Sequence, residues 1–166
     1  MQVTGSRPKI VAAADGRGVV GHAGARLLAD LADVTGLTSA FGDALAPLRV
    51  RQSGHDPGRV AVDLAVMLAD GGEAIADLAV LRHQADLFGV VASDPTAWRL
   101  LSDLDATVLA RLRAARAHAR EVAWAQANEA RTGLPDSMAA GQPVPGLVLD
   151  LDASIVIGEG VRKPDI

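Results

Sequence analysis

Several kinds of residue are absent or scarce in this sequence of 166 residues. Cysteine is absent, which excludes disulfide bonds and thiolate zinc sites. Aromatic residues make up 2% of the chain, as two Phe and two Trp, fewer than a protein that stacks nucleic-acid bases on its rings would need. The four histidines are scattered and lack metal-ligand spacing. The composition therefore argues against disulfide-stapled, zinc-thiolate and base-stacking proteins.

Long apolar runs are also missing. No stretch reaches the roughly 18 uncharged apolar residues that a membrane-spanning helix needs, and the N-terminus lacks the apolar core of a secretory signal. We therefore expect a cytoplasmic protein without a membrane partner. Apolar residues make up 49% and charged residues 22%, which suits a packed core and excludes disorder of the whole chain. The length allows one domain, or one domain and the start of a second.

Positive charge is concentrated in one part of the sequence. The net charge is −4, which argues against a surface that is basic throughout. Residues 105–131, however, hold five basic and three acidic side chains, a sum of +2. Any anion-binding surface must therefore be confined to part of the molecule.

The N-terminal residues predict a β-hairpin. Residues 9–14 have the pattern of a short strand, Asp15-Gly16 suits a tight turn, and Val19-Val20 would begin the returning strand. The glycine spacing of residues 16–21 also matches a dinucleotide-binding fingerprint. In a dinucleotide-binding fold, a second strand should follow the next helix. Residues 36–48 have a helix or loop pattern instead, so the hairpin is favoured.

Helical patterns begin after this hairpin. The first predicted helix starts at Ala25 and ends at Gly36, and a second short helix covers 38–45. We expect the first helix to bury one apolar face, made of Leu27, Leu28, Leu31 and Val34.

Two Asp-Pro dipeptides mark further helix starts. Asp56 and Pro57 suit the N-cap and the first helical position, opening a helix buried nearly all round that ends at Gly71-Gly72. A short helix follows around 75–81, and Ser93-Asp94-Pro95 opens another with the stripe Ala97, Leu100, Leu101 and Leu104. A long helix over 105–129 then turns Leu104, Val108, Leu112, Ala115, Ala119 and Val122 inward.

Two features of these helices suggest contact with DNA. The helices at 75–81 and 95–104 have helix-turn-helix proportions, although the loop between them is long. A recognition helix would place Thr96 and Arg99 near its N-terminus, where base edges are met; an ordinary corner between two bundle helices is the alternative.

Arg113, Arg116 and Arg120 fall within about 60° on a helical wheel. Such a stripe suits phosphates, but the helix dipole also favours it without a ligand.

The character of the chain changes at Arg131. Residues 132–146 are rich in Gly and Pro, which predicts a linker. Residues 147–157 form an apolar run typical of a buried strand, with Asp150 and Asp152 on the same face. Two convergent carboxylates suit Mg²⁺ in phosphoryl transfer, and a solvent-exposed strand end is the simpler alternative.

The Asp150-Leu-Asp152 motif resembles two families. In haloacid-dehalogenase-type phosphatases it opens the chain, which makes a phosphatase the weaker alternative here. In DDE transposases it lies on the first strand of an RNase H-like core. The upstream segments resemble, in order, the N-terminal part of actinobacterial insertion-sequence transposases of the type called "Transposase DDE domain group 1". These segments are residues 9–20, 22–32, 54–60, 69–73 and 93–99.

The resemblance implies a mostly α protein in three parts. Residues 1–131 would form a helical DNA-binding domain containing the hairpin and the helix-turn-helix-like pair, 132–146 a linker, and 147–166 the first strand of an incomplete RNase H-like core. The resemblance makes Asp152 the first catalytic acid and a Mg²⁺ ligand, with Asp150 as its neighbour. DNA at the transposon terminal repeats is the implied partner. A homo-oligomer, or pairing with an intact transposase, is the alternative role.

The residues after Ile157 depart from the family pattern. The tail resembles no family segment, so we expect a truncated, catalytically inactive fragment that binds DNA through Thr96, Arg99, Arg113, Arg116 and Arg120.

This expectation predicts the outcome of a plasmid-nicking assay. Two-metal strand transfer needs several converging acids, and the resemblance assigns Asp152 alone. Supercoiled plasmid with Mg²⁺ or Mn²⁺ should therefore stay intact. Specific cleavage that is lost in Asp152→Ala would contradict this expectation.

Overall fold

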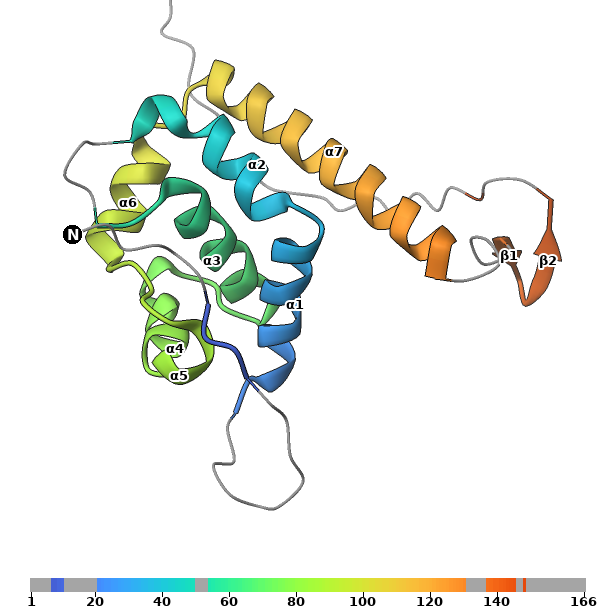
Figure 1. Cartoon of the computed structure of the whole chain (residues 1–166), viewed down its shortest axis with the longest axis horizontal. Helices are drawn as coiled ribbons and strands as arrows, with labels where there is room; N and C mark the ends of the chain where they lie inside the picture. The colour runs from blue at the N-terminus through green and yellow to red at the C-terminus, as the bar shows by residue number, and fades with distance from the viewer. Residues whose placement is uncertain (1–6, 11–20, 50–53, 131–136, 146–147, 149–166) are drawn as a thin grey trace, which may run out of the picture.

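The computed structural model describes residues 7–10, 21–49, 54–130, 137–145 and 148. Helices dominate this part of the chain (Figure 1). They are α1 (Ala23–Val34), α2 (Leu37–Ala44), η1 (Ala46–Leu48), α3 (Pro57–Ala69), η2 (Ile75–Asp77), α4 (Leu78–Arg82), α5 (Ala85–Phe88), α6 (Asp94–Ser102) and α7 (Ala106–Ala130). The mostly α fold predicted from the sequence is confirmed.

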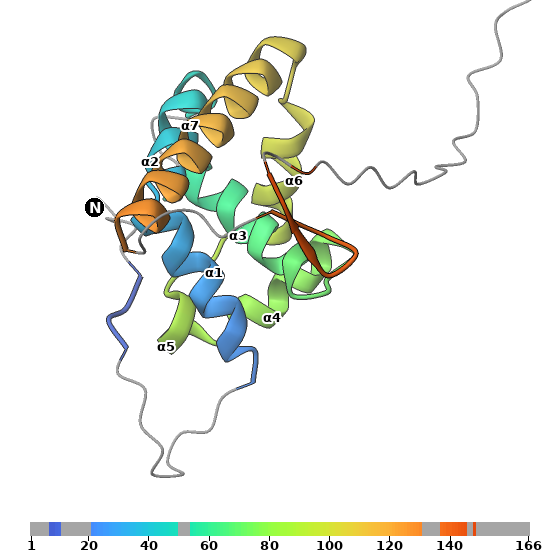
Figure 2. The ribbon, with the colours of Figure 1, turned by 90° about the vertical axis from the view of Figure 1, so that its right-hand side faces the viewer.

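Helix α3 is the centre of the bundle. It contacts α1, α2, α4 and α6, and α7 lies along α2 (Figures 1 and 2). Its start is the predicted one, because the Asp56 carboxylate accepts hydrogen bonds from the backbone N–H groups of Gly58 at 2.9 Å and Arg59 at 3.2 Å. Most of its side chains are buried, as the sequence predicted.

The long helix α7 also agrees with its predicted face. Val108 and Ala119 are buried, and Leu104 and Leu112 pack partly buried against the core. The rest of the helix is largely exposed to solvent. This helix therefore binds the bundle along one narrow line and leaves most of its surface free.

The predicted buried face of α1 is wrong. Leu27, Leu31 and Val34 are 69%, 55% and 67% exposed, and Leu28 is 40% exposed. The side turned to the core instead carries Ala25, Arg26, Ala29 and Ala32. The physical reason is the Arg26 guanidinium, which donates hydrogen bonds to Asp30 and to the backbone carbonyls of Leu87 and Pro8.

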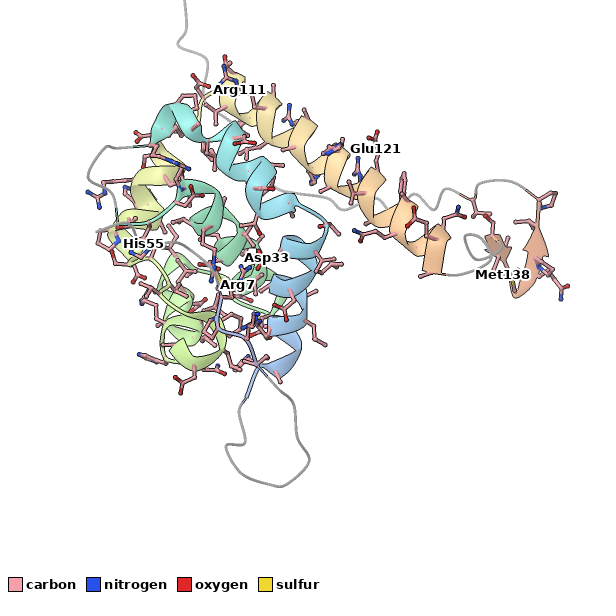
Figure 3. All side chains as sticks on the ribbon, viewed as in Figure 1. Arg7, Asp33, His55, Arg111, Glu121 and Met138 are labelled. Atoms are coloured by element: carbon pink, nitrogen blue, oxygen red, sulfur yellow. The ribbon has the colours of Figure 1, made fainter. Side chains whose placement is uncertain are left out.

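A buried ionic network joins the N-terminal segment to α1 and α3. The Asp63 carboxylate, 2% exposed, accepts hydrogen bonds from Arg59 Nε at 2.9 Å and Arg7 Nη2 at 3.2 Å. Arg7 Nη1 also donates to the Ala29 carbonyl at 3.1 Å and to Asp33 at 2.6 Å (Figure 3). Burial raises the pKa of Asp63, and the two guanidinium groups oppose this rise. At Asp33 burial also acts to raise the pKa, but hydrogen bonds from Arg7 and Thr38 lower it overall.

Arg59 of this network, together with Arg26, caps the end of α5. The last carbonyls of a helix have no partner within the helix. Here Arg26 donates to the Leu87 carbonyl and Arg59 donates to the Phe88 carbonyl. These buried charged side chains therefore hold α1, α3, α5 and the N-terminal segment together.

The helix pair at 75–81 and 95–104 is more elaborate than predicted. Its first member is the 3₁₀ turn η2 followed by α4, and α5 lies in the connection before α6. The connection therefore contains another helical turn in place of the short turn of a simple helix-turn-helix.

Several predicted elements lie partly or wholly outside the described residues. The hairpin turn and returning strand at 15–20 fall there, as does the strand at 147–157 except for Val148. Within the range predicted as a linker, β1 (Ser137–Ala139) and β2 (Gln142–Val144) pair antiparallel, with Ser137 opposite Val144. Their turn uses Ala140 and Gly141 at positive φ.

The buried network predicts a large stability loss in Asp63→Asn. Removing one partner of a buried ionic network leaves uncompensated charge, which costs about 3–5 kcal/mol. Urea unfolding followed by circular dichroism measures this cost. The matched control is Asp43→Asn at an exposed position on α2, expected to change stability by less than about 0.5 kcal/mol. Equal effects of the two variants would contradict the assigned role of Asp63.

Candidate nucleic-acid interface

The three arginines predicted on the long helix form a solvent-facing stripe on α7. Arg113, Arg116 and Arg120 are all exposed, and their spacing of three and four residues places them on one side of the helix. Within the described ranges, none of the three makes an ion pair or side-chain hydrogen bond. We call these residues the arginine stripe. Their guanidinium groups are free to meet an anion.

The neighbours of the stripe are apolar. Leu109 and Trp124 lie one turn before and one turn after it on the same side of α7, and they are 39% and 59% exposed. Sequence reasoning assigned Trp124 no role, although its spacing of four residues from Arg120 was a signal. Arg111 lies about 180° from the stripe and is also exposed (Figure 3), so it offers a natural comparison.

Thr96 and Arg99, the other predicted DNA-contacting residues, lie together on α6. Arg99 Nη2 donates to Thr96 Oγ1 at 3.2 Å, and Arg99 Nε donates to the Pro95 carbonyl at 3.2 Å. The Ser93 and Thr96 hydroxyls are 3.1 Å apart. These contacts hold the Arg99 guanidinium beside the first turn of its own helix.

These two residues line a groove of about 360 Å³ between α6 and the start of α3. We call it the α3–α6 groove. Its lining is mixed, with an apolar part and charged side chains, and consists of Leu48, Arg49, Gly54, His55, Pro57, Val60, Thr96, Arg99, Leu100 and Asp103.

Sequence reasoning missed Arg49 and His55 in this groove. Arg49 pairs with Asp56, the residue that caps α3, and His55 directly precedes that cap (Figure 3). The Asp56-Pro57 signal located the start of α3. It could not show that α6, forty residues later, would lie beside it.

Two glycines set how closely α2 approaches the start of α3, which forms one side of the α3–α6 groove. Gly42 in α2 and Gly58 in α3 are buried against each other. A Cβ atom on Gly58 would lie 2.2 Å from the Gly42 nitrogen and 2.5 Å from its Cα. Because both neighbours are backbone atoms, the two helices can approach this closely only without a side chain at residue 58.

Metal-binding groups are not assembled in the described residues. No group of three or more His, Asp or Glu side chains within them could hold an ion. The predicted metal ligands Asp150 and Asp152 lie outside the described residues. Nor does any helix in the described ranges have the length and apolar character to cross a membrane.

Comparison with known families defines the class of protein. The chain is a transposase-family protein of the DDE type. It belongs to the family described as Transposase DDE domain group 1, which matches residues 2–160. This confirms the family that the resemblance indicated. Searches of curated proteins and of solved structures find no match to the chain.

The close approach of α2 and α3 predicts that Gly58→Ala is destabilising. The added methyl group must push the two backbones apart, and overpacking of this kind costs about 1–3 kcal/mol. Thermal unfolding measures the loss. Gly54→Ala is the control, since a Cβ there meets no atom within 4 Å. Unchanged stability in Gly58→Ala would show that the two helices are not in contact as described.

Proposed function

We propose that the helical part of this chain binds DNA at transposon ends and that the arginine stripe of α7 holds the phosphate backbone. Membership of a DDE transposase family supports a role in transposition. The observation that carries the proposal is the stripe itself, three exposed arginines on one helix side without partners in the described part of the chain.

The spacing of the stripe suits a DNA strand. Seven residues separate Arg113 from Arg120, which is about 10 Å along the helix axis. Phosphates of one strand advance about 3.4 Å each along the duplex axis, so the stripe covers about three phosphate steps. Contacts of this kind position a protein on DNA without reading its sequence.

In this proposal, α6 recognises the base sequence of the DNA. Thr96 and Arg99 lie in its first two turns, where a recognition helix meets base edges. A guanidinium group has five N–H donors, and the two contacts within α6 leave donors of Arg99 available. In this proposal η2, α4 and α6 support DNA recognition in the manner of a helix-turn-helix pair, with α5 inserted between them.

Residues 147–166 are proposed to belong to the RNase H-like catalytic core. Proteins of this family generally use divalent metal ions, and Asp152, with Asp150 beside it, is the acid that the resemblance assigns to the metal. Since both acids lie outside the described residues, this part of the proposal is supported by the motif alone.

The proposal predicts a change in the salt dependence of DNA binding. In Arg113→Gln/Arg116→Gln/Arg120→Gln, the slope of log affinity against log salt should become shallower by up to about 2.7, because each lost phosphate contact removes about 0.9. Fluorescence anisotropy with a labelled duplex at several salt concentrations measures this slope.

The control for this experiment is Arg111→Gln on the opposite side of α7. It removes one positive charge from the same helix, and we expect a slope close to that of the unaltered protein. If the triple variant keeps the original slope, or if Arg111→Gln lowers it by the same amount per arginine, the stripe is not the phosphate-binding surface.

A further inference from the structure

The α3–α6 groove has a different shape from the arginine stripe. The stripe lies on the convex side of an exposed helix, whereas the groove is a hollow of about 360 Å³. This volume is at the small end of the range of about 300–1,000 Å³ for sites that enclose small molecules. The groove is therefore suited to a single small group rather than to the side of a duplex.

The lining of the groove combines two kinds of chemistry. Its apolar surface comes from Leu48, Pro57, Val60 and Leu100. Arg49 and Arg99 contribute positive charge from two separate segments of the chain. A ligand that fits both must have an anionic part and a flat or apolar part.

A nucleotide has these two parts, but a paired nucleotide cannot present them to a groove. In a duplex the base is stacked and paired, and it enters a protein pocket only after leaving the stack or in single-stranded DNA. Unpaired bases stack on aromatic rings or guanidinium planes, and a flipped base also packs between apolar side chains. Among the described residues, the lining of this groove has no Phe, Tyr or Trp and offers guanidinium planes and apolar side chains. The phosphate would be held by guanidinium donors.

We propose that the α3–α6 groove binds one unpaired nucleotide of DNA, with Arg49 and Arg99 at its phosphate and the apolar lining at its base. This inference rests on the proposed DNA-binding function and specifies the form of DNA that the groove takes: the Arg99 guanidinium meets a base edge on a paired duplex, and it meets the phosphate when an unpaired nucleotide occupies the groove. The inference adds Arg49 and the apolar lining residues to those assigned to DNA binding, namely Leu48, Pro57, Val60 and Leu100.

The two arginines are already held in position. Arg99 is fixed by the Pro95 carbonyl and the Thr96 hydroxyl, and Arg49 is fixed by Asp56. Each guanidinium retains further N–H donors. Asp103 also lines the groove, and its carboxylate disfavours a phosphate nearby. The phosphate is therefore directed toward the arginines.

The test compares two DNA probes in fluorescence anisotropy. One is a fully paired duplex, and the other is the same duplex with unpaired nucleotides bulged from one strand. The full chain should bind the bulged duplex about fivefold more tightly or better, because the groove adds a guanidinium–phosphate contact and buries one base against apolar side chains.

The decisive variant is Gly54→Leu, which narrows the groove without changing charge and without adding an aromatic ring on which a base could stack. Gly54 lines the groove, and a Cβ there meets no atom within 4 Å, so the first atom of the new side chain fits without a shift of the backbone. It should bring the affinity ratio of the two probes close to one while binding to the paired duplex persists. Arg49→Gln should lower the same ratio.

The matched control is Gly24→Leu on α1, where a Cβ also meets no atom within 4 Å; it should keep the preference. Thermal unfolding of each variant verifies that it is folded.

Equal binding of the two probes by the unaltered chain overturns the groove proposal. So does a preference that survives in both Gly54→Leu and Arg49→Gln. Binding of the paired duplex that still depends on the arginine stripe would leave the proposed function standing in these cases. If neither probe binds, both proposals are wrong.

Discussion

The carboxylate of Asp63, buried between Arg7 and Arg59, is the constraint on which the rest of the structure depends. A buried charge costs several kcal/mol unless it is paired and hydrogen-bonded. Meeting this requirement brings the N-terminal segment and α1 onto α3, and it brings the end of α5 to Arg59. The position of α3 is therefore set by electrostatics as well as by its apolar side chains.

The proposed DNA-binding surfaces follow from the position of α3. Its N-terminus forms one side of the α3–α6 groove, and its contact with α2 through Gly58 and Gly42 sets where α2 lies. Helix α7 packs along α2 through the side that includes Val108 and Ala119. This packing turns the arginine stripe to solvent. One buried network thus supports a convex basic surface and a concave groove.

Local signals in the sequence predicted the helices well. The Asp56-Pro57 dipeptide gave the start of α3, and the apolar spacing from Leu104 onward gave the inner side of α7. The first helix was predicted with the wrong side buried, because its leucines look like a core stripe, whereas Arg26 has its partners at Leu87 and Pro8, far away in the chain. The exposed arginines of α7 were predictable from helical geometry. The groove was not, because it needs two segments separated by about forty residues to meet.

Photo-crosslinking from α7 tests the central claim most directly. A photoreactive amino acid in place of Leu109 lies on the side of the arginine stripe, and one in place of Ala114 lies about 120° away; both positions are exposed and all arginines are retained. The account predicts crosslinks to duplex DNA from position 109 that disappear at high salt, with far fewer from position 114. Equal crosslinking from both positions, or crosslinking from position 114 alone, would contradict it.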